Sequence, residues 1–344
     1  MPESMAPTLP RADHSGMTST TSTTSTASTT FATSATSATS TTDTPAQAIT
    51  AAASGTWRLG DLEVNRLGFG AMRLTQNGPA FAPGAAPTDR GRAIAVLRRA
   101  VELGVNHIDT AAFYFSPLRS ANELINAALA PYPDDLVITT KVGPGRALSG
   151  EFLPHATPGQ LRGQVEENLR QLGRDHLDVV NLRIVGTDSI AERFGALADL
   201  REAGLIRHLG LSNVQPEHLA EARAIAPVVC VQNLYGLGAR PEQEAFLRTC
   251  GEQGVAYVPF YSIAGTGREA GASGAEHPEV LRVARAHGVG AAEIRLAWTL
   301  HRGPHVLAIP GTGNPDHLTA NVAAASLRLS ADDLAVLDSV GRDD

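Results

Sequence analysis

Eight short apolar segments, each typical of a buried β-strand, alternate with helix-like segments beyond residue 56. They are LGFGA from Leu67, VNHID from Val105, LVITTK from Leu136, LDVVNLR from Leu177, IRHLGLSN from Ile206, VVCVQN from Val228, VAYVPF from Val255 and HVLAIPG from His305. Strands that alternate strictly with amphipathic helices are parallel and are joined by right-handed crossovers. Eight such units close into a cylinder more readily than they form an open sheet. The pattern therefore predicts an α/β fold, a (β/α)8 TIM barrel.

The segments between the predicted strands carry apolar residues at helical spacing, which gives each helix one apolar face. These faces contain Ile94, Leu97 and Val101; Leu161, Val165, Leu169 and Leu172; and Ile190, Phe194 and Leu197. The alternative fold is a doubly wound open sheet, whose first strand leads into a helix through a GxGxxG turn. Here Gly68 and Gly70 lie inside the strand-like run itself. The barrel is therefore favoured.

The N-terminal part of the chain differs in composition from the rest. Residues 1–55 are dominated by Ser, Thr and Ala without periodic large apolar residues, and we expect them to form a disordered tail. Residues 56–344 suffice for one barrel domain. At its start, Trp57 to Leu59 and Leu62 to Val64 flank a Gly60-Asp61 turn, which predicts a β-hairpin. We expect this hairpin to form the floor of the barrel.

Charge and cysteine content exclude several function classes. The formal net charge is −7 and no Lys/Arg-rich run is present, so nucleic-acid binding is not expected. No apolar run approaches the roughly 20 residues that cross a bilayer, and no signal peptide is recognisable, so we expect no membrane contact and a cytoplasmic protein. Cys230 and Cys250 are too few for a disulfide framework and are expected to be structural thiols. No metal site is expected.

Chemistry-bearing residues stand at the ends of the predicted strands, where active sites of barrels are built. Asp109 ends the second strand and Tyr114 follows it, Lys141 ends the third strand, and Arg183 ends the fourth. Alternation along each strand places Asp109 on the same face as His107, Lys141 on that of Thr139, and Arg183 on that of Asn181. The four residues at the strand ends are therefore predicted to converge.

Two interpretations of this cluster remain open. In the first, Asp109 keeps a buried Lys141 charged, and the ammonium lowers the pKa of Tyr114 so that the phenol protonates a reduced carbonyl. Arg183 then polarises the carbonyl oxygen. In the second, the charged residues form a structural network that plugs the barrel, and Tyr114 is an ordinary loop aromatic. His107 is expected to be a packed core residue.

The same residues resemble motifs of the aldo-keto reductase family, and the likeness extends over the chain after the tail. HIDTAAFY is similar to the family's Asp-x4-Tyr signature at Asp109 and Tyr114, and ITTKV to its catalytic-lysine strand at Lys141. The resemblance implies a nicotinamide cofactor. Its carboxamide would be bound by Ser212 and Asn213 of GLSN and by Gln232 of VQN, with Phe260 stacked on the nicotinamide ring.

After the eighth strand, IPGTGNPDHLTAN resembles the segment that family members wrap around the adenosine end of the cofactor, ending in an adenine-contacting Asn321. Backbone N–H groups at Gly311, Thr312 and Gly313 precede a helix and suit phosphate binding. The Gly-rich loop from Ile263 to Gly274 is a second candidate for the pyrophosphate. The family's Lys and Arg that bind the 2′-phosphate correspond to Gly311 and His317. The resemblance implies NADPH, with NADH left open.

One departure affects the chemistry, because the family's usual His is replaced by Arg183, whose guanidinium is permanently charged. The chain resembles a bacterial subgroup with this NLR ending, some members of which act on pyridoxal or pyridoxine. The expected activity is NAD(P)H-dependent reduction of a small aldehyde or ketone. Phe113, Phe115 and Phe152 are candidate pocket walls or loop anchors. The alternatives are a nicotinamide-nucleotide-sensing subunit with little turnover and, ranked last, a metal-dependent barrel hydrolase or isomerase.

Overall fold

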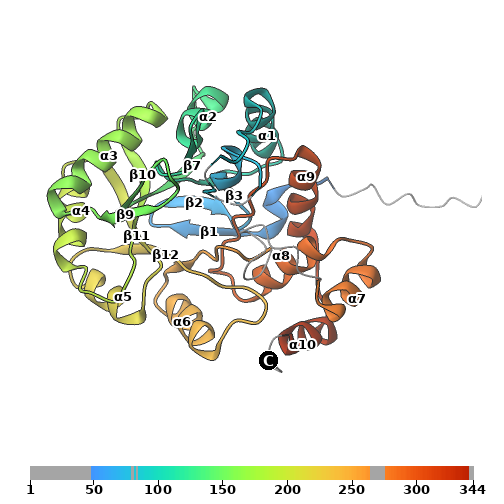
Figure 1. Cartoon of the computed structure of the whole chain (residues 1–344). Helices are drawn as coiled ribbons and strands as arrows, with labels where there is room; N and C mark the ends of the chain where they lie inside the picture. The colour runs from blue at the N-terminus through green and yellow to red at the C-terminus, as the bar shows by residue number, and fades with distance from the viewer. Residues whose placement is uncertain (1–47, 79–80, 83, 264–275, 341–344) are drawn as a thin grey trace, which may run out of the picture. The chain divides into compact units, whose positions relative to one another are not determined.

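A curved parallel sheet forms the centre of the structure, which is a computed structural model that describes residues 48–78, 81–82, 84–263 and 276–340 (Figure 1). The hydrogen-bonded order of its strands is β13-β12-β11-β10-β7-β4-β3. Their bounds are β3 (Phe69–Gly70), β4 (His107–Asp109), β7 (Val137–Val142), β10 (Leu177–Arg183), β11 (Ile206–Ser212), β12 (Val228–Gln232) and β13 (Ala256–Tyr257). Every neighbouring pair is parallel, as the alternating pattern predicts.

The eighth predicted strand joins the two edges of this sheet. Val306 forms a parallel bridge with Tyr257 of β13, and Ala308 forms one with Leu67 just before β3. The N–H of Leu307 donates to the carbonyl of Tyr257 at 2.9 Å, and the N–H of Gly68 donates to the carbonyl of Ala308 at 2.8 Å. The segment HVLAIPG therefore closes the cylinder, and the predicted (β/α)8 barrel is confirmed.

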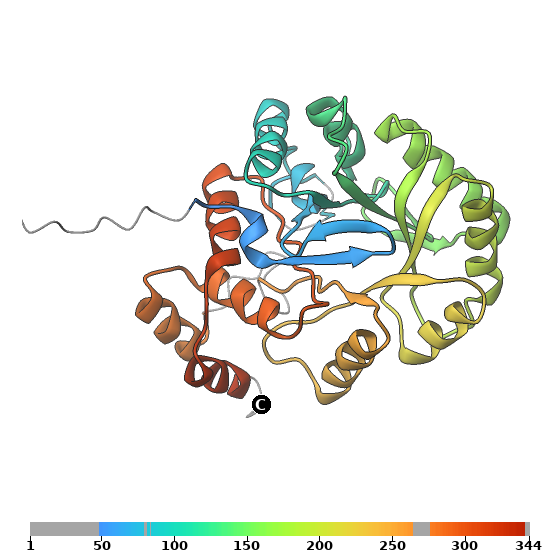
Figure 2. The same cartoon turned by 180° about the vertical axis from the view of Figure 1, so that it is seen from behind.

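Helices surround the sheet in both views (Figures 1 and 2). They are α1 (Arg90–Glu102), α2 (Ala121–Leu129), α3 (Pro158–Leu172), α4 (Ala191–Glu202), α5 (Pro216–Arg223), α6 (Pro241–Glu252), α7 (Pro278–His287), α8 (Ala291–His301), α9 (Pro315–Ala323) and α10 (Ala331–Ser339), with a 3-10 turn η3 (Ala324–Ser326) after α9. The predicted apolar face of α4 is buried, since Phe194 and Leu197 have no exposed surface. On α1 the buried face is centred on Val96 and Leu97, and the predicted Ile94 and Val101 flank it partly buried.

The predicted hairpin covers one end of the barrel (Figure 2) and consists of antiparallel strands β1 (Thr56–Leu59) and β2 (Leu62–Asn65). Leu59 and Val64 are fully buried in a cluster with Val179 and Leu307 of the barrel interior. The turn residue Gly60 has φ +67°, and a Cβ there would lie 2.3 Å from the imidazole of His208. The hairpin is thus the floor of the barrel.

Short elements occupy the opposite end, where the parallel strands have their carboxyl ends. A 3-10 turn η2 (Ala71–Leu74) follows β3. The hairpin β5 (Phe115–Ser116) and β6 (Arg119–Ser120) follows β4, and the hairpin β8 (Pro144–Arg146) and β9 (Phe152–His155) follows β7. These insertions frame the place where the sequence predicts the active site.

The folded part begins before the predicted boundary at residue 56. A 3-10 turn η1 (Ala51–Ser54) precedes the hairpin, and Ala51 is fully buried, with its N–H bonded to the carbonyl of Leu103 at 2.8 Å. Residues 48–55 therefore belong with the barrel, whereas residues 1–47 of the predicted tail lie outside the described residues. In the described part of the chain, no helix has the length and apolar character to span a membrane.

Candidate active site

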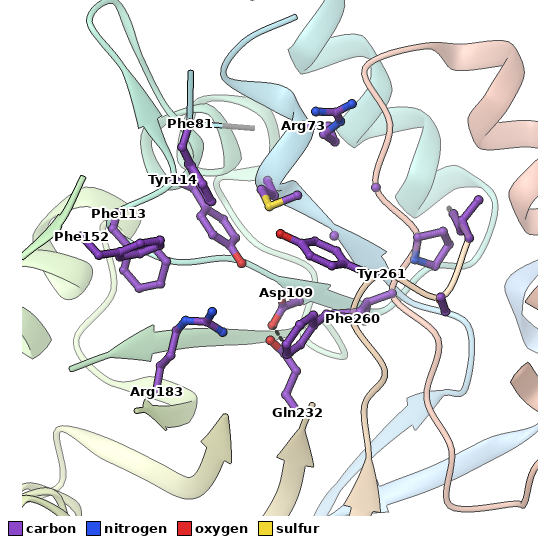
Figure 3. A pocket seen from close by; sticks show the side chains of 17 residues that line it. Arg73, Phe81, Asp109, Phe113, Tyr114, Phe152, Arg183, Gln232, Phe260 and Tyr261 are labelled. Atoms are coloured by element: carbon purple, nitrogen blue, oxygen red, sulfur yellow. Dashed lines mark hydrogen bonds between the residues drawn. The ribbon is translucent and has the colours of Figure 1, made fainter. Parts of the chain in front are cut away.

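A cavity of about 200 Å³ opens where the strands have their carboxyl ends (Figure 3). Among the predicted site residues, it is lined by Asp109, Tyr114, Arg183, Gln232, Phe260 and Gly311. These come from sequence positions that span most of the barrel, from the end of β4 to the segment after the eighth strand. The structure thus brings together most of the residues that the sequence analysis placed at strand ends.

The predicted ion pair lies at the base of the cavity. The ammonium of Lys141 is 2.6 Å from a carboxylate oxygen of Asp109 and also donates to the carbonyl of Thr110 at 3.0 Å. Both charged side chains are almost completely buried. Burial alone favours the neutral amine, but the contact with Asp109 outweighs it, and the pKa of Lys141 stands above its ordinary value. The amine therefore carries its proton at neutral pH.

Tyr114 lies directly beside this pair. The Nζ atom of Lys141 is 4.8 Å from the centre of the Tyr114 ring, and Phe113 packs edge-on against that ring with centres 5.2 Å apart. Burial raises the pKa of Tyr114, and the charge and hydrogen bond of Lys141 offset only part of this effect. The expectation that Lys141 would lower the phenol's pKa below its ordinary value is therefore wrong for this structure, because desolvation exceeds the attraction. The phenol is protonated at neutral pH.

Arg183 ends β10 on the other side of the cavity. Figure 3 shows its guanidinium pointing into the same space as Tyr114 and Asp109. It donates to the hydroxyl of Ser212 at 3.3 Å, and its guanidinium carbon lies 5.5 Å from the ring centre of Phe260 and 6.0 Å from that of Phe152. The guanidinium is therefore held between two aromatic rings, with no carboxylate bound to it in the described part of the chain.

The candidate carboxamide-binding residues gather at the ends of β11 and β12. Ser212 is fully buried and accepts the hydrogen bond from Arg183. Asn213 has φ +60°, and its side chain donates to the carbonyl of Ile184 at 2.8 Å. The amide nitrogen of Gln232 donates to the second carboxylate oxygen of Asp109 at 2.7 Å. Gln232 lines the cavity, whereas Ser212 and Asn213 are not among its lining residues.

The segment after the eighth strand presents backbone donors. Among the described residues, no acceptor is found for the backbone N–H groups of Gly311, Thr312 and Gly313. They lie immediately before α9, whose first turn is capped by the side chain of Asn314 bonded to the N–H of Asp316 at 2.9 Å. Unpaired N–H groups at a helix N-terminus suit an anion such as a phosphate.

The remaining cofactor candidates lie on or near α9. His317 is exposed and Asn321 is buried, and neither they nor Thr312 line the cavity. Of the Gly-rich loop from Ile263 to Gly274, Ile263 lines the cavity and the rest lies outside the described residues. Of the candidates after the eighth strand, only Gly311 lines the cavity.

The aromatic walls differ in part from the expectation. Phe113 and Phe152 line the cavity, but Phe115 does not, because it packs beneath Arg146. Sequence reasoning missed Phe81 and Tyr261, which also line the cavity and both have positive φ, 63° and 68°. Their only sequence signal is an aromatic residue in an otherwise Gly/Pro-rich loop for Phe81, and adjacency to Phe260 for Tyr261.

Other titratable groups near the site are structural. His107 is buried and its Nε2 atom is 3.1 Å from the hydroxyl of Thr139, in agreement with the predicted core position. Cys230 is buried, and burial raises the pKa of its thiol to about 12, which suits the predicted structural role. Among the described residues, no three His, Cys, Asp or Glu side chains are arranged to hold a metal ion.

The family model described as "Aldo/keto reductase family" matches residues 66–342. Pyridoxine 4-dehydrogenase of Escherichia coli (strain K12) is 43% identical over 298 residues, which cover 85% of this chain and 100% of that protein. An uncharacterized oxidoreductase of Schizosaccharomyces pombe is 39% identical over 298 residues, covering 86% and 93%.

Solved structures similar to this chain include further aldo-keto reductases. A crystal structure of an aldo-keto reductase from Klebsiella pneumoniae in complex with NADPH aligns with TM-score 0.65 and 27% identity, covering 80% of this chain and 90% of that one. A thermostable aldo-keto reductase, Tm1743, solved with the inhibitor epalrestat, aligns with TM-score 0.67 and 28% identity, covering 81% and 96%.

Proposed function

The chain belongs to the aldo/keto reductase family, and on that premise we propose that it reduces an aldehyde or ketone to an alcohol with NADPH as the hydride donor, using Tyr114 as the proton donor. The observation that carries this proposal is the buried Lys141–Asp109 ion pair, which lies against the Tyr114 ring at the base of the cavity. A charge network that only stabilises the barrel interior does not require a phenol beside the ion pair.

Each residue has a distinct role in this reaction. Bound NADPH would supply the hydride to the carbonyl carbon. Tyr114 donates its proton to the oxygen that becomes negative, and Lys141 stabilises the phenolate that remains. Asp109 keeps Lys141 charged, and Arg183 polarises the carbonyl oxygen from the opposite side. Because the pKa of Tyr114 is raised by burial, the phenol keeps its proton until the oxygen of the substrate becomes basic.

The residues present fit a nicotinamide dinucleotide. Phe260 offers a ring face inside the cavity, and the amide oxygen of Gln232 accepts no hydrogen bond among the described residues, so it is available to the carboxamide. Ser212 and Asn213 complete the proposed carboxamide site. We assign the phosphates to the unpaired N–H groups from Gly311 to Gly313, and the adenosine end to Thr312, His317 and Asn321 on or near α9.

The cavity walls favour a planar substrate. Phe81, Phe113 and Phe152 contact one another or Tyr114 through their rings, with centres 5.2–5.9 Å apart. Together with the guanidinium of Arg183, they form an aromatic wall that carries a fixed positive charge. A relative with 43% identity is named for pyridoxine. We therefore propose a pyridoxal-like aromatic aldehyde as the substrate.

Tyr114→Phe tests the proposal directly. The variant should lose at least about 10²- to 10⁴-fold in kcat, because proton donation is lost, while it still binds NADPH. The measurement is the nicotinamide absorbance with a panel of aldehydes that includes pyridoxal, run with NADPH and with NADH. Wild-type protein that holds reduced cofactor and oxidises it with no member of the panel would instead support the nucleotide-sensing subunit.

A further inference from the structure

Arg146, in the hairpin after β7, contacts the chain on both sides of Tyr114. Its Nε atom donates to the carbonyl of Phe113 at 2.9 Å, and one of its terminal nitrogens donates to the carbonyl of Phe115. The carbonyls of the residues before and after Tyr114 are thereby bonded to one planar guanidinium. In addition, the N–H of Ala121 donates to the carbonyl of Tyr114 itself at 2.9 Å. The loop that carries Tyr114 is thus fixed at three successive carbonyls.

The same guanidinium also contacts aromatic rings around Tyr114. Its carbon lies 4.1 Å from the ring centre of Phe115 and 4.9 Å from that of Phe81. Phe81 in turn stacks on Tyr114, with ring centres 5.9 Å apart and an angle of 28° between the planes. Arg146 therefore acts on the phenol by two routes, through the backbone on either side and through the ring that lies against it.

The chemistry of the contact requires arginine. Arg146 is only 9% exposed, and no carboxylate pairs with it in the described part of the chain. A buried guanidinium without a counter-ion is costly, so its contacts with carbonyls and rings must compensate. Only a planar fork donates in two directions while its faces stack on rings, and an ammonium does not reproduce this geometry.

Arg146 also lies close in sequence to Lys141 of the ion pair. It follows Lys141 by five residues, through Gly143, whose φ is +124° and whose added Cβ would lie 2.3 Å from the carbonyl oxygen of Arg183. Only glycine fits this turn. One short segment therefore carries both the ammonium beside the phenol and the guanidinium that holds the phenol's backbone.

We propose that Arg146 is a positioning residue that holds the Tyr114 hydroxyl at the height of the Lys141 ammonium and of the substrate oxygen. It does not touch the reacting atoms. The proposal rests on the role of Tyr114 as proton donor, because a displacement of about 1 Å in a donor can cost roughly 100-fold in rate. The competing interpretation is that Arg146 only stabilises the fold.

The test compares Arg146→Met and Arg146→Lys with a matched control, Arg66→Met. Arg66 is likewise an arginine that donates to several carbonyls, among them those of Ser54 at 3.1 Å and Gly303 at 2.6 Å. It precedes β3 at the floor end of the barrel, away from Tyr114. Arg66→Met should lower the free energy of unfolding and leave kcat per folded molecule unchanged.

Two readouts decide between the interpretations. With saturating NADPH, Arg146→Met should lower kcat about 10- to 100-fold, Arg146→Lys should recover part of the loss, and NADPH affinity should be unchanged in both. The second readout is NMR of the protein labelled with ¹³C-tyrosine. The chain has five tyrosines, and the signal of Tyr114 is assigned as the one that disappears in Tyr114→Phe. This signal should shift and broaden in Arg146→Met and stay in place in Arg66→Met.

Either readout can overturn the proposal. An unchanged kcat, or an unchanged Tyr114 signal, in a folded Arg146→Met variant leaves only the structural interpretation. If the wild type reduces no aldehyde, the proposed function fails on its own, and the NMR signal still decides whether Arg146 holds Tyr114 in place.

Discussion

At the scale of single residues, Asp109 makes the most consequential contacts in the site. One of its oxygens holds Lys141 and the other accepts from Gln232, so a single carboxylate connects the proposed catalytic group with the proposed carboxamide site. Sequence spacing predicts the first contact because strands β4 and β7 are neighbours. It does not predict the second, because β12 reaches Asp109 only across the interior of a closed cylinder.

Asp109→Asn should remove about 3–5 kcal/mol from the free energy of unfolding, because it leaves the buried Lys141 ammonium without its counter-charge. The pKa of Lys141 should fall in the same variant. Urea unfolding measures the first effect. Adding Lys141→Met to Asp109→Asn should restore part of the lost stability, since the uncompensated charge is gone, whereas simple additivity of the two substitutions would contradict the pairing.

His107 makes the free energy of unfolding depend on pH in the acidic range. Burial lowers its pKa from 6.5 to about 4, so between these values the unfolded chain binds a proton that the folded chain does not. Stability is therefore full above about pH 6.5 and falls by about 3 kcal/mol as the pH drops to about 4. Urea midpoints across this range should become less dependent on pH in His107→Gln. The same substitution at the exposed His317 is the matched control.

At the scale of elements, the segment after the eighth strand is placed by a close contact between two backbones. An added Cβ at Gly311 would lie 2.5 Å from the carbonyl oxygen of Gly70 at the end of β3, and one at Gly70 would lie 2.6 Å from the carbonyl oxygen of Ile309. Glycine on both sides lets the closing strand and β3 approach each other at the cavity. The proposed phosphate donors before α9 owe their position to this contact.

Gly311→Ala should therefore separate the two segments, lower the free energy of unfolding and weaken NADPH binding. Gly313→Ala is the matched control for stability, because its Cβ would meet the carbonyl oxygen of Arg73 at an ordinary 3.5 Å. Thermal unfolding and a fluorescence titration with NADPH measure the two effects. Equal stability of both alanine variants would show that the contact between Gly311 and Gly70 does not constrain the segment.

At the scale of the whole molecule, the N-terminal boundary of the barrel lies earlier in the chain than the sequence predicts. The tail was expected to reach residue 55, but η1 is anchored to the barrel by several contacts. The hydroxyl of Ser54 accepts from the N–H of Leu67 at 3.0 Å, and Arg66 and Arg328 donate to the carbonyls of Ser54 and Ala53. Composition hides this turn, because its residues are Ala and Ser like those before it.

Deletion of residues 1–47 should leave the unfolding midpoint and the reductase rate unchanged, because their Ser/Thr/Ala-rich composition supplies no periodic apolar residues for a core. Deletion of residues 1–55 should destabilise the barrel, because it removes the buried Ala51 and the carbonyl acceptors of two arginines. Calorimetry on both truncations distinguishes the boundaries. A barrel equally stable after either deletion would support the boundary at residue 55.

The sequence alone determined the class of fold and the residues at the strand ends. Alternating strands and helices, period-two alternation inside each strand and the Gly60-Asp61 turn are local properties. They therefore predicted the barrel, the meeting of Asp109 with Lys141, and the hairpin floor. They also identified Tyr114 and Arg183 as neighbours of that pair.

Tertiary structure decided what depends on segments that are distant in sequence. The walls formed by Phe81 and Tyr261, the second partner of Asp109, and the hold of Arg146 on Tyr114 arise only when loops from different strands meet. The direction of the Tyr114 pKa shift also required the fold, because it is a balance between burial and attraction to Lys141. The sequence reveals the attracting charge, but the degree of burial exists only in the packed molecule.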